Sequence, residues 1–252
     1  MTVRTERDGH VLVVTIDRPE AMNALAPEMM FQLEDAFITL RDDDTLRVGI
    51  VTGAGDRAFC AGADLGRMAG LSVRANPRRL QLFSGLDVMK PIVGAINGHC
   101  LAGGLGLALL CDVRVASENA TFGCMGTARG ILPGAGQTVR LPHVVGMGNA
   151  LWLLLSAERI PAEEALRIGL VNRVVPRGQA LAAAREWADI LASRAPMAVR
   201  ATKESALRGH ALPTAEALAL EGKLGAPLMT SEDAQEGIRA FNEKRTPNWK
   251  GQ

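Results

Sequence analysis

The chain has 252 residues, long enough for one large domain or for a domain with an appendage, and 48% of them are hydrophobic and 22% charged, as in ordinary globular proteins. Its 28 lysines and arginines are balanced by 27 aspartates and glutamates, which leaves a formal net charge of +1. This balance excludes a general attraction to nucleic acid or to an anionic membrane surface, so any partner must be recognised by a local site.

The four cysteines are Cys60, Cys100, Cys111 and Cys124, and they show neither CxxC pairing nor the spacing of metal ligands. Each lies among apolar residues or glycines, which is typical of buried, reduced thiols in a cytoplasmic protein. The sequence therefore predicts no disulfide, no metal site and a cytoplasmic location.

Two segments bear on membrane targeting. The first residues are charged and lack the continuous apolar run of a signal peptide. The uncharged run over residues 91–111 begins at a proline and contains five glycines, so it is not continuously apolar. We expect no membrane span.

The first half of the chain alternates between strand and helix patterns. Runs of β-branched and apolar residues predict strands over residues 11–16, 48–52, 92–96 and 113–117. Helical spacing predicts a helix over residues 27–41, and a polar, mobile stretch over residues 68–76 precedes a helix that reaches about residue 89. This alternation indicates parallel strands joined by crossover helices.

The second half is mostly helical. The predicted helices cover residues 142–156, 161–168, 180–194, 197–207, 214–228 and 231–241, with a short strand over residues 170–175. Ser231 is a typical N-cap for the last helix, and Glu232 and Asp233 suit its first turn. We place a boundary near residue 195, between a core (1–195) and a C-terminal helical region (196–252) that embraces the core or a neighbouring subunit.

The stretch with the strongest chemical signal covers residues 92–112, IVGAINGHCLAGGLGLALLCD. It predicts a buried strand, a turn and a helix that opens at residues 102–104. The first amide groups of a helix have no internal partners, and glycine lets a ligand atom approach them closely, so this geometry suits an anion or oxyanion. Tight packing that only glycine permits is the alternative.

Five segments follow one another over nearly the whole chain: IDRPEAMNAL (16–25), FCAGADL (59–65), AINGHCLAGGLGLALLCD (95–112), FGCMGTARGILPGAGQTVRLPHVVG (122–146) and RIPAEEALRIGLVNRVVP (159–176). Together they resemble the crotonase superfamily, the enoyl-CoA hydratase/isomerase fold. The resemblance implies an α/β fold class, a spiral of repeated ββα units with a C-terminal helical trimerisation region. It also implies a homotrimer or a dimer of trimers.

The resemblance implies that the partner is an acyl-CoA thioester, with coenzyme A as part of the substrate and no other cofactor. By motif position, the backbone N–H groups of Ala63 and Gly103 hold the thioester oxygen. Negative charge builds on this oxygen as an enolate forms, so preorganised donors stabilise the transition state more than the ground state.

Contacts to coenzyme A are implied in the same way. Phe241 and Lys244 reach it from the same or an adjacent subunit, although a solvated C-terminal charge is the alternative for Lys244. Where the family often has a lysine two residues after its aspartate, this chain has Gly66. The residues that border the adenine and pantetheine are Met22, Ala24, Leu25, Ala61, Gly62 and Asp64.

The chain departs from the family at the catalytic acids. Hydratases have two glutamates that position water and move its protons, and the matching residues here are Gly106 and Gly126. Dienoyl isomerases use an aspartate where this chain has Gly134. A positioned acid or base contributes about 10²–10⁴-fold, so an efficient hydratase is not expected.

Two side chains are candidates for the missing proton transfer. His99 precedes the glycine turn and titrates in the useful range, so we predict a catalytic role for it, with a turn histidine bonded to the backbone as the alternative. Cys124 would act only as a thiolate, and no flanking charge indicates a lowered pKa. The carboxylate of Asp64 more simply caps the following helix.

Two functions of different class follow. The first is an enzyme of the enoyl-CoA hydratase/isomerase type, a lyase or isomerase, that stabilises an enolate while His99, water, an anion or the substrate handles the proton. The second is a non-catalytic acyl-CoA binding or carrier protein that retains the pocket.

Overall fold

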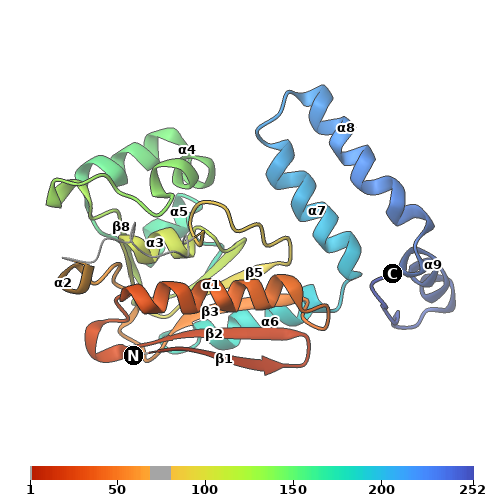
Figure 1. The fold of residues 1–252 in the computed structure, drawn as a ribbon, viewed down its shortest axis with the longest axis horizontal. Coiled ribbons are helices and arrows are strands. Elements are labelled where there is room, and N and C mark those ends of the chain that lie inside the picture. Colours follow the sequence, from red (N-terminus) through yellow and green to blue (C-terminus); the bar gives the residue numbers. More distant parts are fainter. Residues whose placement is uncertain (1, 69–80) are drawn as a thin grey trace.

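The structure is a computed structural model that describes residues 2–68 and 81–252, and two β-sheets lie at its centre (Figure 1). The larger sheet has the strand order β1 (Thr2–Asp8), β2 (Val11–Asp17), β3 (Val48–Gly53), β5 (Ile92–Ile96), β7 (Val113–Ser117) and β10 (Arg173–Val175). The smaller sheet has the order β4 (Ala58–Cys60), β6 (His99–Leu101), β8 (Thr121–Gly123) and β9 (Ile160–Pro161).

The helices alternate with these strands and then form the C-terminal part of the chain. They are α1 (Pro27–Asp42), α2 (Leu65–Met68), α3 (Gly103–Ala108), α4 (Gln137–Ser156), α5 (Ala162–Arg167), α6 (Ala180–Ala192), α7 (Pro196–Gly209), α8 (Thr214–Gly225) and α9 (Glu232–Glu243).

Successive strands divide between the two sheets. Strand β3 joins the larger sheet and β4 the smaller one, and the pairs β5–β6 and β7–β8 repeat this division. Helix α2 follows β4, α3 follows β6 and α4 comes after β8, so each unit reads ββα. The predicted fold class, a crotonase spiral of ββα units followed by a helical region, is confirmed.

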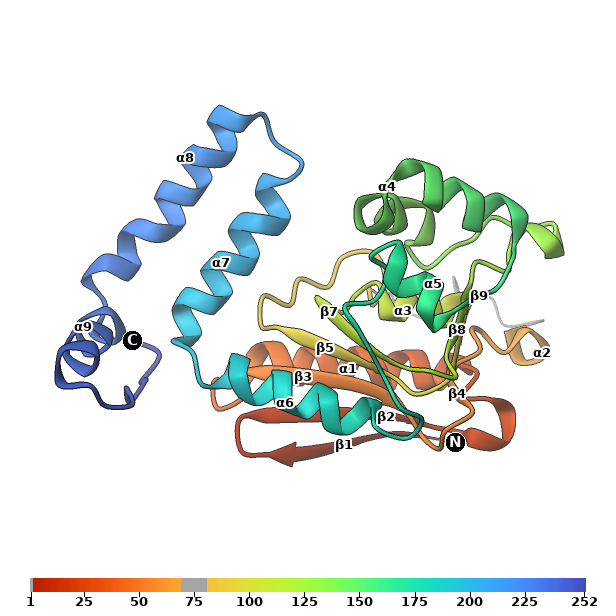
Figure 2. The same ribbon diagram turned by 180° about the vertical axis from the view of Figure 1, so that it is seen from behind.

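The central strands of the larger sheet are buried on both faces. Every residue of β3 and β5 is buried, as expected of parallel strands covered by helices. Because side chains alternate along a strand, Leu12 and Val14 of β2 pack into the cluster that contains α1, whereas Val11 and Val13 pack with the alanines of α6. Figure 2 shows α6 on the face opposite α1.

Five strands were not predicted: β1 and the four short strands of the smaller sheet, β4, β6, β8 and β9. Strand β1 pairs antiparallel with β2 along its whole length. Most of its residues are polar or charged and exposed, so its sequence lacks the apolar alternation that predicts a strand. The three residues of β6 are parallel to both β4 and β8. Strand β6 lies where the sequence predicted only a turn, and it orients the chain that enters α3.

The helix predicted to reach residue 89 is wrong over residues 81–89. These residues form a turn at 82–85 and then an extended segment. The carboxylate of Glu34 accepts the N–H groups of Gln81 (2.5 Å) and Leu82 (2.9 Å), and the Gln81 carbonyl accepts three N–H groups that follow it. These bonds close a single turn. The predicted mobile stretch lies outside the described residues except for Met68, which ends α2.

Other boundaries shift by a few residues. Helix α4 begins at Gln137, earlier than predicted, and it bends at Gly146, whose φ and ψ of 75° and 158° are not helical. Strand β10 keeps only the end of the strand predicted over residues 170–175, because the N–H groups of Leu170 and Val171 close the preceding helix onto the Ala165 carbonyl. The predicted cap is confirmed, since Ser231 accepts the N–H of Ala234 at 3.0 Å.

The helices α7 to α9 lie beside the layered part of the molecule (Figures 1 and 2). No residue of α7 or α8 is buried. The boundary predicted at residue 195 coincides with the N-cap of α7, Ala195. Over the described residues, no helix combines the length and the apolar character that a bilayer crossing requires.

Candidate active site

The entry into α3 is a sharp, strained bend. Ala102 has φ 49° and ψ −121°, a conformation that costs a non-glycine residue about 1–3 kcal/mol, and its N–H donates to the Gly123 carbonyl at 2.9 Å. A side chain on Gly104 would overlap the carbonyl oxygen of Cys60. The packing of α3 against β4 therefore requires glycine here, and it holds Gly103 at the first position of the helix.

A second bend carries Ala63. Gly62 has φ +102°, and its carbonyl accepts the N–H of Leu25 at 2.8 Å, while the Leu25 carbonyl accepts the N–H of Asp64 at 2.9 Å. Leu25 and Ala63 form an isolated parallel bridge. The segment after β2 thus fixes the backbone that follows β4.

The two bends bring two amide groups together. A Cβ built on Gly103 would lie 3.4 Å from the nitrogen of Ala63, and one built on Gly62 would lie 3.1 Å from the nitrogen of Gly103. Among the residues that the structure describes, the N–H groups of Ala63 and Gly103 donate to no acceptor. Two adjacent backbone donors without acceptors can together hold one anionic oxygen atom.

Six of the residues predicted to contact coenzyme A lie around the second bend. The N–H of Ala61 donates to the Met22 carbonyl at 3.0 Å, so the segment of Met22, Ala24 and Leu25 lies against the segment of Ala61, Gly62 and Asp64. Buried Asn23 holds this arrangement, because its side chain donates to the carbonyls of Ala54 and Ala58 and accepts the N–H of Arg18.

The carboxylate of Asp64 has two partners. It accepts Nη1 of Arg18 at 2.6 Å and the N–H of Arg67 at 3.2 Å, so it caps the short helix α2 as predicted. The hydrogen bond from Arg18 lowers the pKa of Asp64. Sequence reasoning missed Arg18, which stands directly before a proline in a segment that otherwise reads as a strand end.

Phe241 and Lys244 lie elsewhere. Both belong to the end of α9, which is at the opposite end of the molecule from α2 and α3 (Figures 1 and 2). The side chain of Phe241 is 83% exposed. Within one chain these two residues are not brought to the other six.

Gly106 and Gly126, predicted to stand where hydratases have glutamates, are closely covered by one loop. A Cβ on Gly106 would lie 2.6 Å from the Cβ and 2.7 Å from the oxygen of Ala135, and a Cβ on Gly126 would lie 2.8 Å from the Ile131 oxygen. The loop over residues 131–135 therefore leaves no room for a side chain at either position. Sequence reasoning gave no sign of this contact, because nothing local in the loop indicates what it packs against.

His99 lies at the far end of β6 from the amide pair. Its Nδ1 is 2.7 Å from the Oγ1 of Thr121, so its partner is a neighbouring strand's hydroxyl rather than the backbone. Four residue steps separate His99 from Gly103. At about 3.3 Å per residue along a strand, the distance between their backbones is at most about 13 Å. The catalytic role of His99 stays a prediction.

All four thiols are buried, and burial raises their pKa values. Burial raises the pKa of Cys124 to about 12, and it raises the pKa of Cys60 and of Cys111 to about the same value. The pKa of Cys100 is raised for the same reason. A thiolate is therefore disfavoured at neutral pH, and all four cysteines are buried, as predicted.

Two further polar residues support the site. Buried Arg114 donates to the carbonyls of Cys111 (2.5 Å) and Leu170 (2.7 Å), which holds the chain just after α3. Gln137 is also buried, and its Nε2 donates to the Gly134 carbonyl at 2.8 Å, which braces the loop over the acid positions. Neither residue carries a sequence pattern that indicates such a role.

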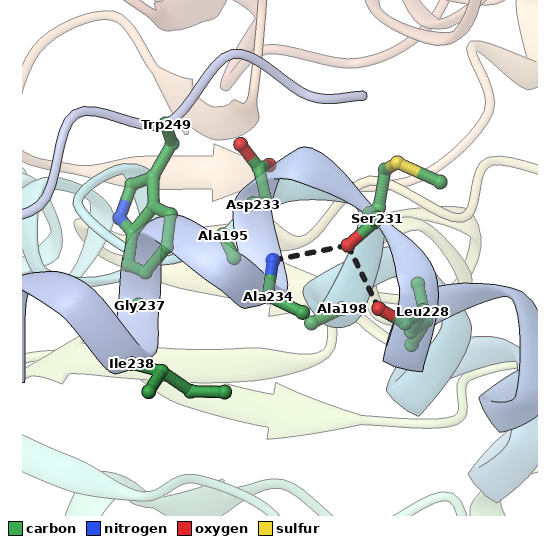
Figure 3. A pocket seen from close by; sticks show the side chains of 10 residues that line it. Ala195, Ala198, Leu228, Ser231, Asp233, Ala234, Gly237, Ile238 and Trp249 are labelled. Atoms are coloured by element: carbon green, nitrogen blue, oxygen red, sulfur yellow. Dashed lines mark hydrogen bonds between the residues drawn. The ribbon is translucent and has the colours of Figure 1, made fainter.

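A separate cavity of about 260 Å³ lies in the C-terminal region, between the start of α7 and α9 (Figure 3). Its wall is mainly apolar, and Trp249 and Ile238 form part of it. The carboxylate of Asp233 accepts the N–H groups of Lys250 and Gly251, so it is already satisfied. The cavity offers no reactive group and is not the candidate site.

Comparison with known proteins agrees with the geometry. The profile of the family described as Enoyl-CoA hydratase/isomerase matches residues 6–252. The chain is 39% identical to an (E)-benzylidenesuccinyl-CoA hydratase of Thauera aromatica, with 100% of both chains covered. It is 40% identical to a short-chain-enoyl-CoA hydratase of Clostridium acetobutylicum, over 95% of this chain and 94% of the other.

Solved structures show the same similarity. A crystal structure of an enoyl-CoA hydratase from Bacillus anthracis superposes with a TM-score of 0.93 at 36% identity, and the match covers 99% of both chains. The family match and these relatives extend over both glycine-bearing bends. The chain therefore belongs to the enoyl-CoA hydratase/isomerase family, the crotonase superfamily.

Proposed function

We propose that the protein binds an acyl-CoA thioester and stabilises its enolate between the amides of Ala63 and Gly103. The observation that carries this proposal is the pair of adjacent N–H groups without acceptors. Such donors interact most strongly with the oxygen when it carries negative charge, so they lower the barrier to enolate formation. They are held by packing and need no reorganisation during the reaction.

The coenzyme A part of the ligand then lies along the second bend, against Met22, Ala24, Leu25, Ala61, Gly62 and Asp64. Leu25 is fully buried, so its contribution is to position the backbone. Phe241 and Lys244 contact the ligand of an adjacent subunit in a homotrimer or dimer of trimers. Their distance from the amide pair within one chain and the exposure of Phe241 support this assignment.

The protein is not an efficient straight-chain hydratase in this proposal. Gly106 and Gly126 provide no acid or base, and the loop over residues 131–135 closes the space that carboxylates would need. The proton is then transferred by water, by an exogenous anion, by the substrate or by His99. The hydrogen bond of His99 to Thr121 and its place on β6 favour the first three.

The filled acid positions also favour a second function, a non-catalytic acyl-CoA binding or carrier protein. The two functions share the amide pair and differ only in turnover. A retained pocket without proton transfer would bind thioesters and release them unchanged.

One experiment separates these outcomes. Calorimetric titration of the protein with butyryl-CoA and with free coenzyme A measures the thioester contribution, and a crotonyl-CoA hydration assay measures turnover. We expect tighter binding of the thioester and hydration slower than in a glutamate-containing relative by at least about 10²-fold. Equal binding of both ligands would contradict the oxyanion hole, and hydratase-like turnover would contradict the role assigned to the missing acids.

A further inference from the structure

Two histidines that belong to different parts of the molecule face each other. His143 lies on α4, and His210 is the C-cap of α7. Nδ1 of His143 is 3.0 Å from Nε2 of His210, with ring centroids 5.0 Å apart and ring planes at 82°. Both residues are exposed, so one imidazole N–H donates to the lone pair of the other within reach of solvent.

We propose that this pair is a binding site for a divalent transition-metal ion of the nickel and copper type. Neutral imidazole nitrogens are common ligands for such ions. With metal–nitrogen bonds of about 2.0–2.1 Å, two nitrogens 3.0 Å apart subtend about 94° at the metal. This angle suits neighbouring positions of a square-planar or octahedral ion, whereas a tetrahedral ion needs nitrogens about 3.3–3.4 Å apart.

Binding requires only local changes at the two rings. The ring that now donates its N–H carries that proton on its other nitrogen instead, so both facing nitrogens present lone pairs and no proton is released. The exposed rings turn so that each lone pair points to the ion, about 43° away from the line that now joins the two nitrogens. Within residues 2–68 and 81–252 no group of three or more histidines, cysteines or acids could hold a metal, so water completes the coordination.

The neighbouring charges on α7 are already engaged. Arg208 lies 2.9 Å from a carboxylate oxygen of Glu204 and 3.1 Å from one of Asp87. These carboxylates are therefore not free to replace an imidazole. Because α4 packs into the core and α7 begins the C-terminal region, a bound ion would link the two parts of the chain.

The test is a calorimetric titration of the full-length, untagged protein with Ni²⁺, comparing the wild type with His143→Ala and His210→Ala. His10→Ala is the matched control, because His10 is an exposed histidine whose ring bonds a backbone carbonyl, Thr45, at 2.8 Å. We expect one Ni²⁺ per chain, bound at least about tenfold more weakly in either site variant and unchanged in the control, since the second ligand acts at high effective concentration.

Hydrogen exchange provides a second readout that does not depend on affinity. Ni²⁺ should slow the exchange of amides at the end of α7 in the wild type and not in His210→Ala. The proposal is overturned if the wild type shows no saturable binding, if either single variant binds as tightly as the wild type, or if Zn²⁺ binds more tightly than Ni²⁺.

Discussion

The central strands of the larger sheet and the helices of the C-terminal region differ in what their side chains contact. Strands β3 and β5 are buried at every residue, whereas α7 and α8 have no buried residue. Burying an apolar side chain stabilises a fold by about 1.5–3 kcal/mol, so the strands that lead to the amide pair are held strongly. Within one chain, helices α7 and α8 lack this source of stability.

Polar contacts hold the C-terminal region instead. Nζ of Lys203 donates to the Lys90 carbonyl at 2.9 Å and to the carboxylate of Asp112 at 2.7 Å, and Arg47 donates to the carbonyls of Ala192 and Trp249. Such contacts are weaker than a packed core and depend on pH and salt. The comparison indicates that the two glycine-bearing bends are fixed by packing, whereas α7 and α8 are held mainly by polar contacts.

The largest effect on stability and binding should follow from Gly104→Val, at the start of α3. The new side chain overlaps the Cys60 carbonyl, so the free energy of unfolding should fall by about 3 kcal/mol, the upper end for overpacked cores. Binding of butyryl-CoA should be lost, because Gly103 moves with its neighbour. Urea unfolding and calorimetry provide the measurements.

Gly148→Ala is the matched control for this change. A Cβ on Gly148 meets no atom within 4 Å, and the residue lies in α4. Alanine should therefore stabilise the protein by about 0.4–1 kcal/mol. If Gly104→Val were as stable as the control, tight packing would not be what positions the amide.

A second change tests the loop that covers the acid positions. The double variant Gly106→Glu/Gly126→Glu should be less stable by about 1–3 kcal/mol per site, because the new side chains displace Ala135 and Ile131. Hydration of crotonyl-CoA should not increase. A gain of about 10²-fold or more in this activity would show that the loop yields and that the missing carboxylates were the only defect.

Lys203→Met should have a smaller effect on stability. We expect it only where α7 contacts the layered part of the molecule. Removing the ammonium group deletes charged hydrogen bonds, which are worth about 1.5–3 kcal/mol, and leaves Asp112 bonded only to the Ile92 amide. Hydrogen exchange should accelerate in α7 and remain unchanged in β3. The same substitution at exposed Lys223 serves as the control, and faster exchange in β3 would contradict the separation of the two parts.

The C-terminal region should also lose stability in acid. Hydrogen bonds from Arg245 lower the pKa of Glu236 from its ordinary 4.5 to about 2. Because the unfolded state binds the proton more tightly, this contribution is complete above pH 4.5 and is lost as the pH falls towards 2. Hydrogen exchange of α9 should accelerate over this range and be less pH-dependent in Glu236→Gln. Glu216→Gln, on exposed α8, should leave the pH profile unchanged.

The smallest effect should follow from His99→Gln. Glutamine can keep a hydrogen bond to Thr121, and the residue lies away from the amide pair, so butyryl-CoA binding and any turnover should stay within about twofold of the wild type. A loss of turnover with unchanged binding would instead support the catalytic role predicted for His99.

Patterns within the sequence determined much of this protein. The β-branched runs predicted the four central strands, the glycines marked both bends, and Ser231 marked the start of α9. Each of these features depends on residues close together in the chain, through side-chain alternation, capping or turn geometry.

Only the tertiary structure decided which distant segments meet. The loop over residues 131–135 covers Gly106, Glu34 closes the turn at residues 82–85, α9 lies far from the amide pair, and His210 faces His143. These contacts join segments well separated in sequence, and their free energy comes from packing and from partners that a local pattern does not contain.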